Sequence, residues 1–325
     1  MIFLKPVEKL FHLLVHTKNR LYSLQILNAV KLSIPVISVG NLSFGGVGKT
    51  PCVIFLAEEL VKKYKINIIT KSYKANLRYP ERVKLKSDNS AQKFGDESCL
   101  LQAQLPSCNV WAGPNKSQTA LASLVDQPGL IILDDGFSHL KLKRNFDLLL
   151  IDATQGFNTY LREPIGSLKR AHAVLITKTN LSQSEKVSEI KKQIANLAPH
   201  LSEHIFLSRM KTELALDKIM PLFIFCGLGR PETFVQDLTQ QGYKVVHQKF
   251  FPDHHNYTIS DQQQLLDEYN KLLKKHDNIR LVTTEKDLTK ISEISLKKYL
   301  TVPKHNLEMD RVQKEALFEK IRLSL

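Results

Sequence analysis

The sequence has few cysteines and no long apolar segment, and these two absences exclude several classes of protein. Its four cysteines show no C-x-x-C spacing, so neither a zinc site nor a disulfide framework is indicated. No apolar run approaches the ~18 residues that span a bilayer, and the N-terminus lacks the apolar core and cleavage site of a signal peptide. We therefore expect a chain that neither crosses a membrane nor is exported, in a reducing cytoplasmic setting.

Acidic residues are also scarce relative to basic ones. The 325-residue chain has 46 Lys and Arg against 32 Asp and Glu, which gives a formal net charge of +14. Such a charge favours acidic partners, namely nucleotide phosphates, an anionic membrane surface or nucleic acid. No basic patch interleaved with aromatic residues supports nucleic-acid binding, and no protein partner is evident. We therefore expect phosphates and a membrane surface rather than nucleic acid.

A glycine-rich loop after a short apolar segment is the most informative feature. The β-branched residues 34–39 predict a buried strand, and the loop that follows ends in Lys49-Thr50 before an apolar helix. Glycines let backbone N–H groups turn toward one anion, and Lys49 can reach the β- and γ-phosphates. Ser43 replaces the first glycine of the usual G-x-x-x-x-G-K-[ST] pattern, and the alternative is a glycine-rich turn that binds nothing. The predicted nucleotide-binding residues are Ser43, Phe44, Gly45, Gly46, Val47, Gly48, Lys49 and Thr50.

Two adjacent aspartates follow another apolar segment. Residues 130–133 predict a strand, and Asp134-Asp135-Gly136 come next, as a Walker B carboxylate follows a strand near a P-loop. A structural carboxylate pair is the alternative, but a buried strand offers few reasons for one. We therefore expect Asp134 and Asp135, with the hydroxyl of Thr50, to hold Mg²⁺.

Two further clusters of titratable residues have open interpretations. Asp96 precedes a predicted helix and is either its N-cap or a carboxylate presented to a substrate. His254 and His255 follow Asp253 after a predicted strand and are too few for a zinc site. One of the two histidines is expected either to accept a proton, working with a carboxylate of the first domain, or to be structural.

The segment Thr177-Lys178-Thr179-Asn180 ends another predicted strand and indicates which nucleotide binds. A guanine-specific site would have N-K-x-D here, but Thr177 replaces its asparagine and Asn180 its aspartate. GTP is therefore disfavoured, and ATP is the expected nucleotide.

The order of predicted elements indicates the fold. Strands and helices alternate over the first ~200 residues, which predicts an α/β, P-loop NTPase-like, doubly wound and mainly parallel sheet. The pattern restarts near residue 211 and predicts a second, smaller α/β domain. The expected division is an N-terminal amphipathic helix (1–30), a P-loop domain (31–211) and a smaller C-terminal domain (212–325) that contributes to the active-site cleft.

The N-terminal helix has two interpretations. Apolar residues recur at helical spacing over residues 4–15, while Lys5 and Lys9 lie on the opposite face. Such a helix either lies on an anionic membrane surface, with its apolar side in the headgroup boundary, or packs on the domain.

A series of different short motifs extends in a fixed order along most of the chain. They are Val39-Gly40-Asn41 leading into the glycine-rich loop, Gly95-Asp96-Glu97, Asp134-Asp135-Gly136-Phe137 with His139, Leu161-Arg162-Glu163-Pro164, Gly227-Leu228-Gly229, Asp253-His254-His255 and Thr284-Glu285-Lys286-Asp287. With this set the chain resembles the tetraacyldisaccharide 4′-kinases of lipid A biosynthesis, which are membrane-associated P-loop kinases. It departs from them at Lys71-Ser72, where Arg-Gly is usual, at Ser98, where proline is usual, and at Ser138, where glutamine is usual.

The resemblance implies a reaction and a set of site residues. The reaction is transfer of the γ-phosphoryl group of ATP to the 4′-hydroxyl of a tetraacylated glucosamine disaccharide 1-phosphate, which gives lipid IVA. The implied catalytic pair is Asp96 and His254, with His255 in reserve. A lipid substrate implies peripheral attachment at the cytoplasmic face of the inner membrane. The expected Mg²⁺ ligands are Thr50, Asp134, Asp135 and Glu163.

A different function stays open at this point. Glycine-rich loops of this kind also serve ATPase or GTPase switches and metal-insertion chaperones, whose output is a conformational change. The poor histidine spacing and the absent N-K-x-D disfavour this alternative.

Overall fold

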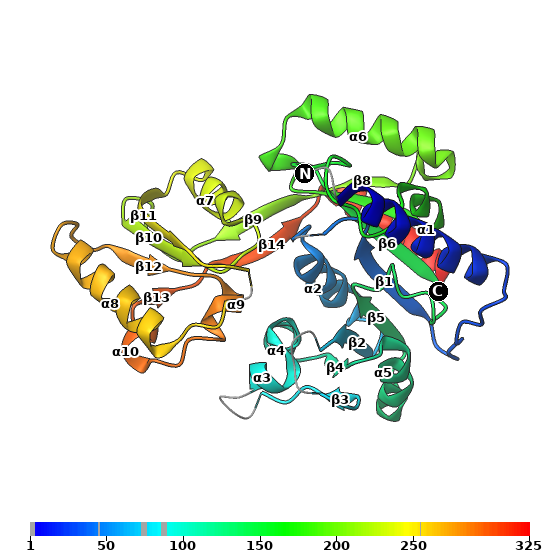
Figure 1. Cartoon of the computed structure of the whole chain (residues 1–325), viewed down its shortest axis with the longest axis horizontal. Coiled ribbons are helices and arrows are strands. Elements are labelled where there is room, and N and C mark those ends of the chain that lie inside the picture. The colour runs from blue at the N-terminus through cyan, green and yellow to red at the C-terminus, as the bar shows by residue number, and fades with distance from the viewer. Residues whose placement is uncertain (1–3, 45, 73–76, 86–89, 254) are drawn as a thin grey trace. The chain divides into compact units, whose positions relative to one another are not determined.

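The computed structural model describes residues 4–44, 46–72, 77–85, 90–253 and 255–325, and the chain forms two compact units (Figure 1). The first unit comprises residues 1–210 and 307–325, and the second comprises residues 211–306. The chain passes between them in β9 (Arg209–Glu213) and β14 (Lys304–Glu308), which pair with each other in a two-stranded sheet.

An eight-stranded sheet forms the centre of the first unit, with the order β3-β4-β2-β5-β1-β6-β7-β8. Neighbouring strands are parallel except for β3 and β4. The central strands are apolar and buried along their length, as expected for a parallel sheet covered on both faces. The strands are β1 (Val36–Asn41), β2 (Ile66–Lys71), β3 (Glu81–Arg82), β4 (Asn109–Gly113), β5 (Leu130–Asp134), β6 (Phe146–Asp152), β7 (Ala173–Thr177) and β8 (Ile205–Leu207).

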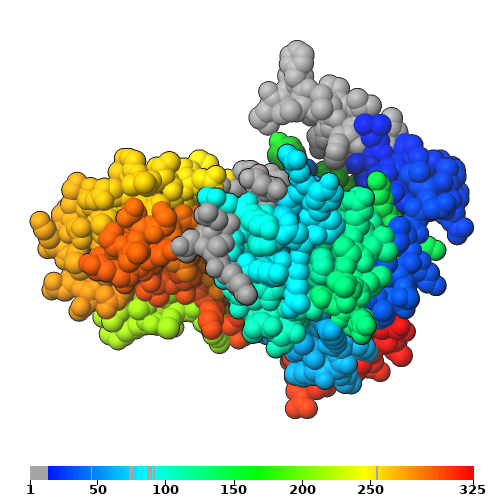
Figure 2. All heavy atoms as spheres, turned by 90° about the horizontal axis from the view of Figure 1, so that it is seen from below, coloured from blue at the N-terminus to red at the C-terminus, as the bar shows by residue number. Residues whose placement is uncertain are grey.

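Helices cover both faces of this sheet, because successive strand residues point to opposite sides. Leu148 and Leu150 of β6 join the core beneath α2 and α11, whereas Leu149 and Ile151 join the core beneath α6. The segment that carries α3 and α4, coloured cyan, lies at the surface of the unit (Figure 2). The helices of this unit are α1 (Leu4–Ser23), α2 (Lys49–Leu60), α3 (Ser90–Phe94), α4 (Asp96–Gln104), α5 (Lys116–Ser123), α6 (Ser184–Leu197) and α11 (Arg311–Ser324), with 3₁₀ segments η1 (Leu124–Asp126), η2 (Ile165–Arg170), η3 (Thr179–Leu181) and η4 (Pro199–Leu201).

The C-terminal helix α11 belongs to the first unit, which corrects the predicted domain 212–325. Leu317, Phe318 and Ile321 are buried in the core that also contains α2. The Phe318 ring lies 5.7 Å from the Phe55 ring. Burial of this apolar face holds the end of the chain on the first unit.

The second unit contains a four-stranded parallel sheet with the order β11-β10-β12-β13. Phe223, Phe225 and Leu281 pack with Leu265 and Tyr269 of α8 on one face of this sheet. The strands are β10 (Pro221–Cys226), β11 (Lys244–Phe250), β12 (Arg280–Val282) and β13 (Leu300–Thr301), and the helices are α7 (Pro231–Gln240), α8 (Ile259–Leu273), α9 (Glu285–Leu288) and α10 (Ile294–Lys297). The predicted fold class, a mainly parallel α/β sheet with a second, smaller α/β unit, is confirmed.

The predicted N-terminal helix is present as α1, which is the longest helix of the chain's described part at 20 residues. None of the helices in the described ranges combines the length and the apolar character that crossing a bilayer requires.

Candidate active site

The glycine-rich loop connects the carboxyl end of β1 to the N-terminus of α2. Gly48 has a φ of +89°, which favours glycine, and α2 begins at Lys49. Since Gly48 has no side chain to cap the helix, the first N–H groups of α2 can face an anion. Thr50 is buried beneath the loop, whereas the Phe44 side chain is exposed. Gly45 lies outside the described residues.

The loop is fastened by the segment that stands in place of N-K-x-D. Thr177 Oγ1 donates a hydrogen bond to the Val47 carbonyl oxygen (2.8 Å), and Lys178 Nζ donates to the Gly46 carbonyl oxygen (2.7 Å). The same ammonium group lies 2.8 Å from Asp152 Oδ2. This segment is therefore hydrogen-bonded to the backbone of the glycine-rich loop.

Asp134 ends β5, the strand directly beside β1, and pairs in register with Val39. Its side chain is only 2% exposed. Thr70 Oγ1 donates to Asp134 Oδ2 (3.2 Å), but Oδ1 has no hydrogen-bond partner among the described residues. Burial, reinforced by the charge of Glu97, raises the pKa of Asp134 to about 6. A buried carboxylate oxygen with no donor is a suitable ligand for a cation.

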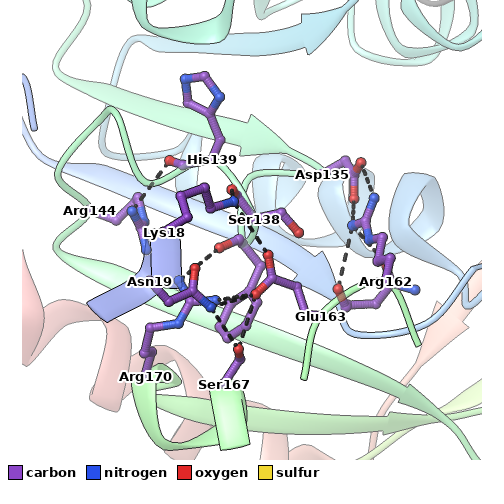
Figure 3. A network of polar contacts seen from close by, with 12 residues as sticks. Lys18, Asn19, Asp135, Ser138, His139, Arg144, Arg162, Glu163, Ser167 and Arg170 are labelled. Carbon is purple, nitrogen blue, oxygen red and sulfur yellow. Dashed lines mark hydrogen bonds and ion pairs between the residues drawn. The ribbon is translucent and has the colours of Figure 1, made fainter. Parts of the chain in front are cut away.

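Unlike Asp134, Asp135 has cationic side chains around it. Arg162 binds both of its carboxylate oxygens, with Nη1 2.8 Å from Oδ2 (Figure 3). Lys49 Nζ lies 3.6 Å from Oδ1, and Lys116 Nζ donates to the backbone carbonyl of Asp135 (2.6 Å). Burial alone would raise the pKa of Asp135, but Arg162 and the two lysines hold it well below its usual range. Asp135 is therefore an anion that gathers three positive side chains.

Asn41 ties this cationic group to the phosphate loop. Its Oδ1 accepts from Lys49 Nζ (3.2 Å) and from Arg162 Nη2 (3.0 Å), and its Nδ2 donates to the Ser43 carbonyl oxygen (2.6 Å). The turn after β5 also packs closely on β1, because a Cβ on Gly40 would lie 2.4 Å from Phe137 Cβ. Close packing and hydrogen bonds thus connect the described part of the loop to the turn after β5.

Three residues of this site were not predicted to act in it. Lys116 is 5% exposed and had no sequence signal beyond its position before a helix. Arg162 and Asn41 stood in recognisable motifs, but the pattern alone gave them no role. Their charges and amide make this edge of the sheet suited to binding a polyphosphate.

Asp96 is the first residue of α4, and its N-cap is Gly95, whose φ is +88°. Asp96 is therefore not the cap that one interpretation proposed. Helix α4 packs against β2 and β4 of the sheet. The charge of the neighbouring Glu97 helps to raise the pKa of Asp134.

The structure does not bring Glu163 to the other predicted metal ligands. Its carboxylate is 1% exposed and accepts hydrogen bonds from Asn19 Nδ2 (3.0 Å) and Arg170 Nη2 (3.1 Å) (Figure 3). Within the ranges that the structure describes, no three His, Cys, Asp or Glu side chains are grouped as metal ligands would be. The reason is local: Arg162 and Glu163 are adjacent, but their side chains leave the segment in different directions (Figure 3).

His254 lies outside the described residues, and the contacts of the neighbouring His255 are as follows. His255 Nε2 lies 3.1 Å from Asp261 Oδ2 at the start of α8. Its ring stacks on Phe251, with centroids 4.8 Å apart and an interplanar angle of 26°, and meets Tyr257 edge-on at 5.1 Å. His255 therefore has two aromatic neighbours and one polar contact.

Comparison with known proteins agrees with this geometry. The profile of the family described as LpxK, Tetraacyldisaccharide-1-P 4′-kinase, matches residues 1–324. The tetraacyldisaccharide 4′-kinase of Halothermothrix orenii is 30% identical over 95% of this chain and 87% of its own length. That of Desulfotalea psychrophila is 31% identical over 94% and 92%. The crystal structure of the "apo" form of LpxK from Aquifex aeolicus in complex with ATP superimposes with a TM-score of 0.74, at 26% identity over 99% of this chain and 98% of that one.

Proposed function

Because the chain belongs to the tetraacyldisaccharide-1-P 4′-kinase family, it is an ATP-dependent kinase of lipid A biosynthesis, and we propose how its own residues divide the reaction. The observation that carries the proposal is the arrangement around Asp135. A phosphate loop, a buried carboxylate with a free oxygen and three cationic side chains converge at the same edge of the sheet. Phosphoryl transfer requires such positioning and charge neutralisation.

In this proposal the loop amides and Lys49 bind the phosphates of ATP. Arg162 and Lys116 add positive charge where the transition state gains negative charge. The unpartnered Oδ1 of Asp134 fits a divalent cation, so Asp134 and the hydroxyl of Thr50 would hold Mg²⁺, with phosphate oxygens as further ligands. The ion, when bound, neutralises phosphate charge. We leave Asp135 and Glu163 out of the metal set because other side chains already engage their carboxylates.

Asp96 and His254 are the proposed proton acceptors for the 4′-hydroxyl. A hydroxyl of a sugar needs a base nearby as it attacks the γ-phosphorus, and a carboxylate and imidazole pair supplies one. Asp96 begins α4, which packs against β2 and β4 of the sheet that carries Asp134, and this position is compatible with the proposed role.

The reaction itself is tested by following the γ-phosphoryl group. We expect label from γ-labelled ATP to appear on a tetraacyldisaccharide 1-phosphate presented in detergent, and the label to depend on Mg²⁺. Lys49→Ala, which removes the phosphate-binding ammonium group, is the control for contaminating kinases. ATP hydrolysis that ignores the lipid but responds to a protein would instead support a nucleotide switch.

We also propose that the chain meets its lipid peripherally, at the anionic cytoplasmic face of the inner membrane. A tetraacylated substrate leaves a bilayer only at ~0.8 kcal/mol per exposed CH₂, so the enzyme must approach the membrane. One residue within α1 and two in the turn after it support such contact, because Leu14, Leu24 and Ile26 are 62%, 59% and 64% exposed. Arg20, which is exposed at the end of α1, would bind an anionic headgroup at about 1 kcal/mol.

This contact predicts that apolar exposure near α1 matters for vesicle binding. Leu24→Asp combined with Ile26→Asp should weaken binding to vesicles containing phosphatidylglycerol by at least ~10-fold, because each leucine-sized side chain contributes ~1.5 kcal/mol or more when buried. Val125→Asp is the matched control, since Val125 is 75% exposed on η1. Co-sedimentation at two salt concentrations provides the measurement. Equal binding by the double variant and the control would remove this turn from the membrane contact.

A further inference from the structure

Two residues of α1 contact the segments that carry the Asp135 and Arg162 ion pair (Figure 3). Asn19 Nδ2 donates to Glu163 Oε2 (3.0 Å) and to Ser167 Oγ (3.1 Å). Lys18 Nζ donates to the Ser138 carbonyl oxygen (3.3 Å) and lies 3.9 Å from Glu163 Oε1. The helix expected at the membrane therefore reaches the interior of the first unit through polar contacts.

Glu163, which Asn19 contacts, lies in the short segment that also carries Arg162. The N–H groups of Arg162 and Glu163 both donate to the Leu42 carbonyl oxygen, at 2.8 and 3.2 Å, immediately before the phosphate loop. Ser43 also pairs with Leu161 in an antiparallel bridge. This short segment is thus held between the phosphate loop on one side and α1 on the other, and Arg162 extends from it to Asp135.

The contact of Lys18 with Ser138 lies close in sequence to Asp135, the acidic partner of the ion pair. Ser138 lies three residues after Asp135, in the turn that follows β5. Arg170, which donates to Glu163, lies over the Phe137 ring at 4.5 Å. Both partners of the Asp135 and Arg162 pair are therefore connected to α1 through neighbours in sequence.

The burial of the Glu163 carboxylate makes its position sensitive to the loss of a hydrogen-bond donor. At 1% exposure it depends on its donors, because a buried charge that loses a hydrogen bond is costly to keep in place. Without Asn19, Ser167 and Arg170 of η2 remain as hydrogen-bond donors to Glu163, and Lys18 remains 3.9 Å from Oε1. We expect the carboxylate and the backbone at residue 163 to shift toward η2, and Arg162 to shift with them.

We propose that Lys18 and Asn19 are positioning residues for ATP binding: they fix the Ser138 and Glu163 segments and so couple the position of α1 to nucleotide affinity. This inference rests on the proposed nucleotide site. One consequence concerns the membrane contact. Deletion of α1 would alter ATP binding as well as vesicle binding, so substitutions on its exposed side are the cleaner way to test membrane attachment.

The test compares Asn19→Ala with His16→Ala, which changes an exposed residue of the same helix. Asn19→Ala should raise both the Kd for Mg²⁺-ATP and the KM for ATP by at least ~5-fold, while the KM for the lipid stays unchanged. His16→Ala should leave all three values unchanged. Isothermal titration with Mg²⁺-ATP gives the Kd without any lipid, so failure of wild-type binding would refute the nucleotide site and not the coupling.

A rescue experiment separates positioning from simple support of the fold. Asn19→Asp places a second carboxylate beside Glu163 and should weaken ATP binding at least as much as Asn19→Ala. Combining Asn19→Asp with Glu163→Gln restores one amide and one carboxylate, with the amide now at position 163 and the carboxylate at position 19. This double variant should recover most of the affinity for Mg²⁺-ATP. If Asn19→Ala does not fold, Lys18→Met provides the same comparison. A lowered Tm with unchanged Kd for ATP, or an equal loss in His16→Ala, would overturn the proposal.

Discussion

Replacing Asp134 by asparagine should stabilise the empty protein above about pH 6 and abolish its response to Mg²⁺-ATP. The folded-state pKa of Asp134 is raised to about 6, so the folded state holds this proton more tightly than the unfolded chain, where an aspartate has a pKa of ~3.9. The buried charge therefore reduces stability as the pH rises from ~4 to ~6, and the loss persists above that range. Asparagine keeps the shape of the side chain and removes the charge.

The size of the gain follows from the shift. About two pKa units correspond to on the order of 2 kcal/mol in the free energy of unfolding, reduced by the new amide donor that finds no partner beside Thr70. Below pH ~4 the variant and the wild type should be equally stable. Above pH ~6 the variant should have the higher Tm without nucleotide.

The same change should remove the proposed metal ligand. Wild-type Tm should rise on addition of Mg²⁺-ATP, because ligand binding to the native state stabilises it, and the variant should show little rise. Turnover should fall at least ~100-fold, since charge neutralisation by a metal contributes several kcal/mol to phosphoryl transfer.

Thermal unfolding from pH 4 to 8, with and without Mg²⁺-ATP, measures both effects. Glu97→Gln is the matched variant, because it removes the neighbouring charge that helps to raise the pKa of Asp134 and leaves Asp134 itself in place. Its loss of stability should still begin near pH 4, where the unfolded chain titrates, but it should be smaller and be complete at a lower pH. An Asp134→Asn variant that still gains stability from Mg²⁺-ATP would show that Asp134 is not the metal ligand.

The parts of this site that could be predicted are those fixed by local sequence. Residues 34–50 contain a strand, a glycine-rich loop and a helix start in order, so the phosphate loop follows from neighbouring residues alone. Asp134 could be placed beside it because carboxyl ends of parallel strands lie at one edge of a sheet. This prediction required only that the two strands belong to the same parallel sheet. In the structure β5 lies directly beside β1.

The remaining contacts depend on pairings between distant segments. Lys116 reaches Asp135 because β4 lies next to β2, and β2 next to β5, an order that no local pattern states. Arg162 reaches it because Leu161 pairs with Ser43. Glu163 was expected to be a Mg²⁺ ligand, but its carboxylate accepts a hydrogen bond from Asn19 of α1, 144 residues earlier in the chain.

The return of α11 to the first unit is a further case of this kind. Its amphipathic pattern predicts a helix with one buried face but does not say which core receives that face. Lys314 contacts Glu59 across a separation of 255 residues, and Phe55 meets Phe318. Periodicity therefore found the helix, while its place in the fold required tertiary packing.

The second large effect is expected at the proposed catalytic pair, Asp96 and His254, and it distinguishes His254 from His255. His254→Ala should lower turnover by at least ~100-fold, the lower range for a general base, with ATP binding nearly unchanged. His255→Ala should instead lower Tm, because His255 stacks on Phe251 and contacts Asp261, which also caps α8 together with Thr258. Its turnover at a temperature well below Tm should stay within ~10-fold of the wild type.

Asp96 provides the internal check on this assignment. If Asp96 and His254 act on one proton, Asp96→Ala should cause a similar loss, and the double variant should be little worse than either single variant. Single-turnover transfer to the lipid, measured beside the Kd for Mg²⁺-ATP, separates the chemical step from nucleotide binding. Normal turnover in His254→Ala with an inactive, folded His255→Ala would move the catalytic role to His255. The aromatic stack and the Asp261 contact would then orient a base instead of supporting the loop.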